Sequence, residues 1–157
     1  MAEIMANELD PNFKLEVAAR LGGANIKRCF ACGACTGSCP ASQVVEEFDP
    51  RKIIHMIILG LREQVLSSPI IWYCLLCNTC SFVCPQDVRF SEAMSVLRQM
   101  AVKEGYVSSS FQKRLEAIEE LNQKLRAEML RCALSEKDKK EKSSLKQLLE
   151  EACKKCI

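Results

Sequence analysis

The pattern of hydrophobic and polar residues predicts a chain built from helices. Asp49 can cap a helix that begins at Pro50, because an aspartate cap and a proline in the first turn are typical helix starts. Apolar residues then recur at helical spacing, at Ile53, Ile54, Ile57, Ile58, Leu61 and Val65. The sequence "SSP" at 67–69 is expected to end this helix and to start a short one that runs into Cys74. No segment shows a clear strand-like alternation, so we expect an all-α fold.

A second amphipathic helix is predicted after residue 90. Ser91 can cap it, and Gly105 is expected to end it. Its inward-facing residues would be Ala93, Met94, Leu97, Met100 and Ala101. Each half of the region before residue 110 thus contributes one amphipathic helix.

The character of the chain changes from Phe111 onward. A narrow apolar stripe follows a charged helix, at Leu115, Ile118, Leu121, Leu125 and Met129. The segment 135–144 is nearly all polar, and the chain closes with "LKQLLEEACKKCI". We therefore expect one domain over residues 1–110 and a charged helical extension over 111–157, which is either a solvated tail or a docking element for a partner.

Composition narrows the class of protein. The 157 residues are 48% hydrophobic and 27% charged, which is ordinary for a globular domain. A net charge of +2 gives no electrostatic case for nucleic-acid binding. The longest apolar run, "IIHMIILGL" at 53–61, is far shorter than the roughly 20 residues of a membrane-spanning helix. No secretory signal is visible, so we expect a cytoplasmic protein without a membrane span.

Cysteine is the residue type that carries the chemistry. Eight of the 11 cysteines form two blocks, "CFACGACTGSCP" at 29–40 and "CLLCNTCSFVCP" at 74–85. The second block repeats the cysteine spacing of the first after 45 positions, and each block ends in proline. The ligand candidates are Cys29, Cys32, Cys35 and Cys39 in the first block, and Cys74, Cys77, Cys80 and Cys84 in the second.

This spacing indicates iron–sulfur clusters. Disulfides are disfavoured, because the cysteine count is odd and no export signal is visible. Zinc usually takes separated C-x2-C pairs and would leave two cysteines of each block unused. The run C-x2-C-x2-C-x3-C-P is instead the bacterial ferredoxin pattern for a [4Fe–4S] cluster. The sequence therefore predicts two [4Fe–4S] clusters.

The ferredoxin pattern also predicts which cysteines share a cluster. In two-cluster ferredoxins the fourth cysteine of each block serves the other cluster. Cluster 1 would then use Cys29, Cys32, Cys35 and Cys84, and cluster 2 would use Cys74, Cys77, Cys80 and Cys39. In the uncrossed alternative, each block holds its own cluster. The apolar residues between the ligands are expected to exclude water: Phe30, Ala31, Ala34, Leu75, Leu76, Phe82 and Val83. Hydrogen bonds to cluster sulfurs could come from nearby backbone N–H groups and from Thr36, Ser38, Asn78, Thr79 and Ser81.

Residues 26–107 resemble the C subunit of heterodisulfide reductase, an alpha-helical ferredoxin with two [4Fe–4S] clusters. The likeness rests on "CFACGACTGSCP", "DPRKIIHMIILGL", "WYCLLCNTCSFVCPQDV" and "AMSVLRQMAVKEGY". The resemblance implies an electron-transfer protein that passes electrons between the flavin-containing A subunit of heterodisulfide reductase and its catalytic B subunit, which has CCG motifs. A hydrogenase or formate dehydrogenase would be a further partner in the larger complex.

The chain itself is expected to be non-catalytic, because it contains no Cys-Cys dipeptide. The alternative function is the [4Fe–4S] module of another respiratory-type oxidoreductase, a relative of fumarate reductase or glycerol-3-phosphate dehydrogenase. Against it, a plant-type C-x4-C-x2-C segment and CCG repeats are both missing from this chain. Three cysteines lie outside the blocks, Cys132, Cys153 and Cys156, and we expect them to bind nothing, with a redox-active C-x2-C pair as the alternative. His55 is expected to be a packing or surface residue.

Overall fold

The described part of the protein is helical. The computed structural model describes residues 9–20, 25–134 and 150. They contain α1 (Phe13–Arg20), η2 (Ile26–Arg28), α2 (Ala34–Gly37), α3 (Pro50–Leu59), α4 (Arg62–Leu66), η3 (Pro69–Trp72), α5 (Thr79–Phe82), α6 (Phe90–Lys103) and α7 (Ser109–Leu134), where η marks a 3-10 helix. No strand occurs within these ranges, which confirms the predicted all-α class.

The chain divides into two compact units, Met1–Val107 and Ser108–Ile157. The first unit contains both cysteine blocks and every described helix except α7. The division falls close to the boundary expected after residue 110. That the two units are separate functional domains stays a prediction.

The start of α3 follows the sequence prediction. The Asp49 carboxylate accepts a hydrogen bond from the Lys52 N–H at 3.1 Å, and Pro50 occupies the first turn. Ile53, Ile54 and Ile57 are buried, as their spacing required. The cap and the apolar face therefore both favour a helix at this position, and such agreement between local signals is typical of sequences that fold to one structure.

The prediction of one helix through Val65 is wrong. The helix ends at Leu59, Gly60 takes a left-handed conformation with φ of 84°, and α4 begins at Arg62. The cause is a close crossing of the chain near its N-terminus, because the Asp10 N–H donates to the Gly60 carbonyl oxygen at 2.8 Å. A Cβ atom on residue 60 would lie 2.3 Å from the Asp10 carbonyl oxygen, so only glycine fits here.

Arg62 joins three helical segments at this crossing. Its Nη1 atom lies 2.7 Å from Glu16 of α1 and 3.2 Å from Asp10, and its Nη2 atom lies 2.5 Å from Glu104, just after α6. The guanidinium also lies over the Phe13 ring, 5.3 Å from its centroid. These groups are partly exposed, so the network mainly holds the orientation of α1, α4 and α6 and adds little stability per pair.

The buried centre of the first unit is formed by α6. The five residues predicted to face inward are all fully buried: Ala93, Met94, Leu97, Met100 and Ala101. Gly105 follows the helix with φ of 80°, as expected of a helix end. The predicted cap is wrong, because α6 begins at Phe90 and its N-cap is Arg89. Ser91 instead lies buried inside the first turn, with its hydroxyl 2.5 Å from the Asn78 side-chain oxygen.

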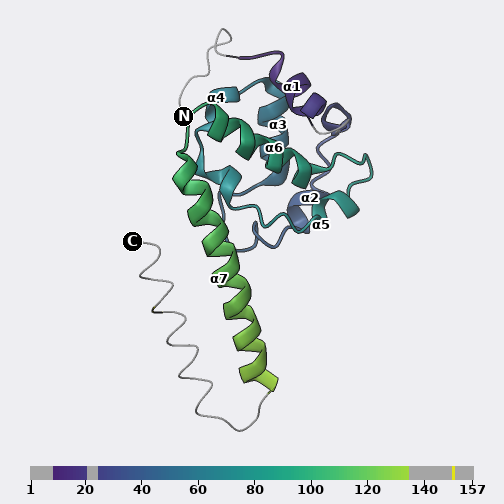
Figure 1. Ribbon diagram of the computed structural model, residues 1–157. Helices are drawn as coiled ribbons and strands as arrows, with labels where there is room; N and C mark the ends of the chain where they lie inside the picture. The colour runs from purple at the N-terminus through teal and green to yellow at the C-terminus, as the bar shows by residue number, and fades with distance from the viewer. Residues whose placement is uncertain (1–8, 21–24, 135–149, 151–157) are drawn as a thin grey trace. The chain divides into compact units, whose positions relative to one another are not determined.

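The first unit contains the same arrangement of a short and a longer helix two times. The short helices α2 and α5 occupy equivalent positions in the two cysteine blocks, and each packs against the longer helix that follows it, α3 or α6. Figure 1 shows α2 and α5 side by side, away from α1 and α4. The duplication seen in the sequence is therefore also a duplication of structure.

The second unit contains α7, which confirms the predicted helix after Phe111. Leu115, Leu121 and Leu125 of its apolar stripe are half-buried, whereas Ile118 and Met129 are exposed. Lys124 and Glu120, one helical turn apart, form an ion pair at 2.6 Å. The polar segment 135–144 lies outside the described residues. Across the described ranges, no helix has the length and hydrophobicity needed to span a membrane.

Replacing Gly60 with alanine is expected to destabilise the protein strongly. The variant combines the conformational cost of a left-handed alanine with a steric clash against the Asp10 backbone, for a loss of about 2–4 kcal/mol in unfolding free energy. Gly105→Ala is the matched control, because Gly105 has a similar φ but no atom within 4 Å of the added Cβ. It should cost only about 1 kcal/mol. Denaturant unfolding of the metal-loaded protein measures both, and equal losses would refute the role of the close contact.

Candidate metal centre

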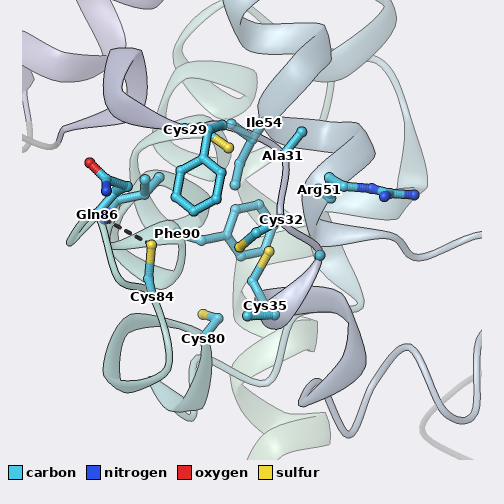
Figure 2. A pocket seen from close by; sticks show the side chains of 14 residues that line it. Cys29, Ala31, Cys32, Cys35, Arg51, Ile54, Cys80, Cys84, Gln86 and Phe90 are labelled. Atoms are coloured by element: carbon cyan, nitrogen blue, oxygen red, sulfur yellow. Dashed lines mark hydrogen bonds between the residues drawn. The ribbon is translucent and has the colours of Figure 1, made fainter.

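A first cavity lies between the two cysteine blocks. It has a volume of about 390 Å³, which includes open solvent at its mouth. Its wall contains five cysteines, Cys29, Cys32, Cys35, Cys80 and Cys84. Figure 2 shows the sulfur atoms of these five residues around one space, with Phe90 behind them. Ile54 of α3 and Val88 complete an apolar lining. Four of the five cysteines are those predicted for cluster 1.

A second cavity shares Cys80 with the first. Its volume is about 310 Å³, and it is lined by Cys39, Cys74, Cys77 and Cys80, together with Asn78, Thr79 and Ser91. These four cysteines are the set predicted for cluster 2. One of them, Cys39, comes from the first block, just as Cys84 of the second block lies in the first cavity.

Cys80 lies in the wall of both cavities. Assigning Cys80 to the second cavity gives each cavity four cysteines, because the first has four others. All eight cysteines of the two blocks are free thiols, with no disulfide between them. In the described ranges, no group of three or more His, Cys, Asp or Glu side chains is arranged to hold a single metal ion.

Left-handed backbone occurs at equivalent positions of the two blocks. Ala31 and Gly33 have φ of 59° and 82°, and Leu76 and Asn78, 45 positions later, have φ of 51° and 63°. All the non-glycine residues with positive φ in the described chain lie in or beside these blocks. Such residues cost about 1–3 kcal/mol each and persist only where the surroundings impose them. The surroundings of both blocks therefore impose the same backbone conformation at equivalent positions.

The surroundings shift the pKa of four of the thiols, raising it at three and lowering it at one. Burial raises the pKa of Cys35, Cys74 and Cys80, and at Cys74 the charge of Arg98 acts in the opposite direction. A hydrogen bond with Thr79, whose Oγ lies 3.4 Å from the Cys77 sulfur, lowers the pKa of exposed Cys77. The buried thiols are therefore protonated at neutral pH without metal, and metal binding must release their protons.

The polar residues between the ligands only partly behave as predicted. Thr79 does contact the Cys77 sulfur, but the Ser38 hydroxyl donates to the Ala34 carbonyl oxygen, and the Thr36 hydroxyl donates to Asp49 at 2.6 Å. A backbone group also contacts a sulfur atom, as expected: the Val88 N–H donates to Cys84 at 3.4 Å (Figure 2). Main-chain donors carry no residue signature, so the sequence could not name Val88 in advance.

The apolar residues expected to exclude water are divided in the same way. Leu76 packs against the core, and Ala31 and Ala34 are half-buried. Phe30 lines the first cavity and Leu75 the second, although both side chains are largely exposed. The prediction is wrong for Phe82 and Val83, which are exposed and line neither cavity, with Phe82 at 86%.

Two arginines near the cavities were missed by the sequence analysis. Arg51 of α3 contributes to the wall of the first cavity, and its side chain extends away from the sulfur atoms in Figure 2. Arg98 of α6 is buried and donates three hydrogen bonds to the backbone that leads into Cys74. An arginine with neighbouring apolar residues in an amphipathic helix gives no hint of such a role before the tertiary contacts are known.

The remaining candidates lie apart from the cavities. His55 is exposed on α3, as expected of a surface residue. Cys153, Cys156 and the side chain of Cys132 lie outside the described part of the chain, so the predictions for them remain predictions.

Comparison with known proteins identifies the domain. Residues 25–88 match the family model of the 4Fe-4S dicluster domain. Over 120 residues the chain is 38% identical to an iron–sulfur protein of Methanocaldococcus jannaschii, the C 2 subunit of its CoB–CoM heterodisulfide reductase, and the match covers 72% of this chain and 63% of the relative. It is 32% identical over 105 residues to the C subunit of the H2:CoB-CoM heterodisulfide,ferredoxin reductase of Methanothermobacter thermautotrophicus, with 67% and 56% covered.

A third relative extends the same pattern. The C2 subunit of the H2/formate:CoB-CoM heterodisulfide,ferredoxin reductase of Methanococcus maripaludis is 40% identical over 82 residues, which cover 52% of this chain and 44% of the relative. The chain thus spans less than two thirds of the length of these curated relatives.

Residues 25–88 therefore form a domain of the 4Fe–4S dicluster class, which binds [4Fe–4S] clusters. Beyond that class, the chain is similar to the C subunits of the heterodisulfide reductases. The resemblance predicted from the sequence motifs is confirmed.

Ala31 offers a test of the strained backbone. Ala31→Val places a β-branched residue at φ of 59°, which should cost about 1–2 kcal/mol beyond alanine and lower the iron bound per chain. Ala31→Gly should retain both stability and iron, because glycine accepts this conformation. Ala117→Val, on the exposed side of α7, controls for the swap itself and should cost under about 1 kcal/mol. Unchanged iron content and stability in Ala31→Val would contradict the requirement for this conformation.

Proposed function

We propose that the chain is the electron-transfer iron–sulfur subunit of a heterodisulfide-reductase-type complex and holds one [4Fe–4S] cluster in each cavity. The observation that carries the proposal is the pair of cavities, each with cysteines from both blocks in its wall. Cysteine thiolates are the ligands of such clusters, so the donor set fits the cofactor. When bound, a [4Fe–4S] cluster supplies reversible one-electron transfer.

The same cavities support the crossed ligand sets. Cys29, Cys32, Cys35 and Cys84 would hold cluster 1, and Cys74, Cys77, Cys80 and Cys39 would hold cluster 2. In the uncrossed alternative, Cys39 would have to turn away from the cavity in whose wall it lies, and so would Cys84. The positive-φ turns and apolar walls then hold the thiolates in place and keep bulk water from the inner side of each site.

The partners are proposed from the chemistry and from the names of the relatives. A flavin-containing A subunit would deliver or accept electrons, and a CCG-containing B subunit would carry the disulfide chemistry. The relatives' names include H2 and formate, which supports a hydrogenase or a formate dehydrogenase in the larger complex. The exposed rim residues Phe30, Leu75 and Phe82 suit such an assembly, because apolar side chains around an opening are common at protein interfaces.

The chain is proposed to conduct electrons without catalysing disulfide reduction. Four thiolates in each cavity leave no coordination position for a substrate sulfur. The chain also contains no Cys-Cys dipeptide of the kind that a CCG motif supplies. Its own residues therefore hold the clusters, shield them from water and orient the thiolates. The reduction of the disulfide is carried out by a partner.

Ligand crossing is tested by comparing cysteine variants. The reconstituted chain should bind about eight irons, the content of two [4Fe–4S] clusters. Cys84→Ala should remove the same electron paramagnetic resonance signal that Cys32→Ala removes, and Cys39→Ala should match Cys77→Ala. Each variant should lose up to about half of the iron. If Cys84→Ala instead matched Cys77→Ala, each block would hold its own cluster and the crossed assignment would be wrong.

Electron conduction is tested by reconstitution with partner proteins. The isolated chain should be reduced by a low-potential donor and should not reduce a disulfide. Turnover should appear once a flavin-containing donor and a CCG-containing catalytic partner are added. Cys77→Ala should then bring donor-linked turnover down to background and spare turnover driven by a dye that reduces the CCG-containing partner directly. Disulfide reduction by the isolated chain at the rate of the complex would rule out the conduit function.

A further inference from the structure

Arg98 and Ser91 are the buried polar side chains of the described residues. They are 8% and 2% exposed, whereas the other buried side chains of these ranges are apolar. Both belong to α6 and lie seven positions apart, which places them on one face of the helix, two turns from each other. That face meets the second cysteine block, because Ser91 lines the second cavity and Arg98 bonds to the Cys74 backbone.

Arg98 is held rigidly beside the second cavity. Its Nε atom donates to the Ile71 carbonyl oxygen at 2.9 Å, and Nη2 donates to the carbonyl oxygens of Trp72 and Cys74 at 3.1 and 2.6 Å. The guanidinium also lies over the Trp72 ring, 5.4 Å from its centroid. These contacts fix a full positive charge next to the chain segment that presents Cys74. Because the group is buried, water screens this charge only weakly.

The first cavity has a different charge environment. Its nearby cation, Arg51, is exposed and extends toward solvent, where its charge is screened (Figure 2). The Asp49 carboxylate accepts a hydrogen bond from Thr36, the residue next to Cys35. Burial of Asp49 would raise its pKa, but hydrogen bonds from Thr36 and the Lys52 N–H outweigh this and lower it, so the group is ionised. The first cavity therefore has a negative group nearby and a screened positive one.

Solvent exposure does not separate the two sites. Each has one exposed cysteine, Cys32 in the first cavity and Cys77 in the second. The clearest electrostatic difference between them is the buried guanidinium. Reduction adds one negative charge to a site, and a nearby fixed positive charge stabilises that added charge.

We propose that Arg98 makes the cluster of the second cavity the more easily reduced of the two, so that an electron delivered to the chain comes to rest between Cys39, Cys74, Cys77 and Cys80. The inference rests on the proposed function, one [4Fe–4S] cluster in each cavity. Arg98 is a positioning residue: it orders the backbone before Cys74 and sets the electrostatic potential there. It thereby gives an electron a preferred resting site within the chain.

The order of the two potentials is measured on the unaltered, metal-loaded chain. A redox titration followed by electron paramagnetic resonance gives one midpoint for each signal, and Cys77→Ser identifies the signal of the second cavity as the one it alters. That signal should appear at the higher potential. The opposite order would overturn the inference while leaving the proposed function intact. Failure of the chain to assemble two clusters would instead contradict the proposed function.

Arg98 variants test the cause. Arg98→Gln removes the charge and should shift the reduction equilibrium of the second cluster about tenfold toward the oxidised form, which is about 59 mV for one electron. Arg98→Lys retains the charge and should restore most of that shift, even though lysine cannot make the same three hydrogen bonds. If Arg98 only supported the fold, both variants would lower the unfolding temperature and neither would change the second midpoint selectively.

Arg51→Gln is the matched control, since it removes one positive charge from the wall of the other cavity. The midpoint of the second cluster should stay unchanged in this variant. Equal shifts of the second midpoint in Arg51→Gln and Arg98→Gln would overturn the role of Arg98. If Arg98→Gln lost its iron, Arg98→Lys and the order of midpoints in the unaltered chain would decide the question. A second midpoint that fell by about 59 mV in Arg98→Lys, a tenfold change in the equilibrium, would then overturn the role of the charge.

Discussion

The packing of α2 against α5 is the constraint on which both cavities depend. Each of these helices has four residues and is too short to be stable alone, so its position is set by its neighbours. Their contact brings the end of each cysteine block to the cavity of the other block. Cys84 and Cys39 are thereby exchanged between the two halves, and Cys80 lies between the two spaces. Neither half could form a complete four-cysteine site in this arrangement without the other.

The longer helices supply the rigidity that the short ones lack. α3 and α6 follow equivalent cysteine blocks, and both bury their apolar faces in one core. That burial holds the left-handed residues of the blocks in a conformation that costs free energy locally. The hydrophobic core therefore contributes to holding the sites, and it includes Cys80 itself. The Gly60 crossing and the Arg62 network orient helices that pack in this core.

The two halves of the first unit have closely similar backbone conformations in their cysteine blocks, but the charged residues beside the two cavities differ. Left-handed residues and short helices recur after 45 positions, so both cavities lie beside equivalent backbone. α6 has a buried arginine at the second cavity, whereas the arginine that α3 contributes to the first is exposed. Two sites with unlike charges suit an electron-transfer protein, because equal sites would give the electron no preferred position.

The sequence by itself determined the kind of chemistry and much of the helical pattern. Cysteine spacing identifies a cluster type because the ligands of one block are close in the chain, and the Asp49–Pro50 start and the apolar face of α6 are equally local signals. The tertiary structure decided what depends on distant contacts. The break at Gly60 follows from Asp10, the hydroxyl of Ser91 is bound by Asn78 instead of capping a helix, and Arg98 reaches a backbone segment more than 20 positions away. The sequence pattern did predict which cysteines share a site, and the packing of α2 against α5 is what brings them to common cavities.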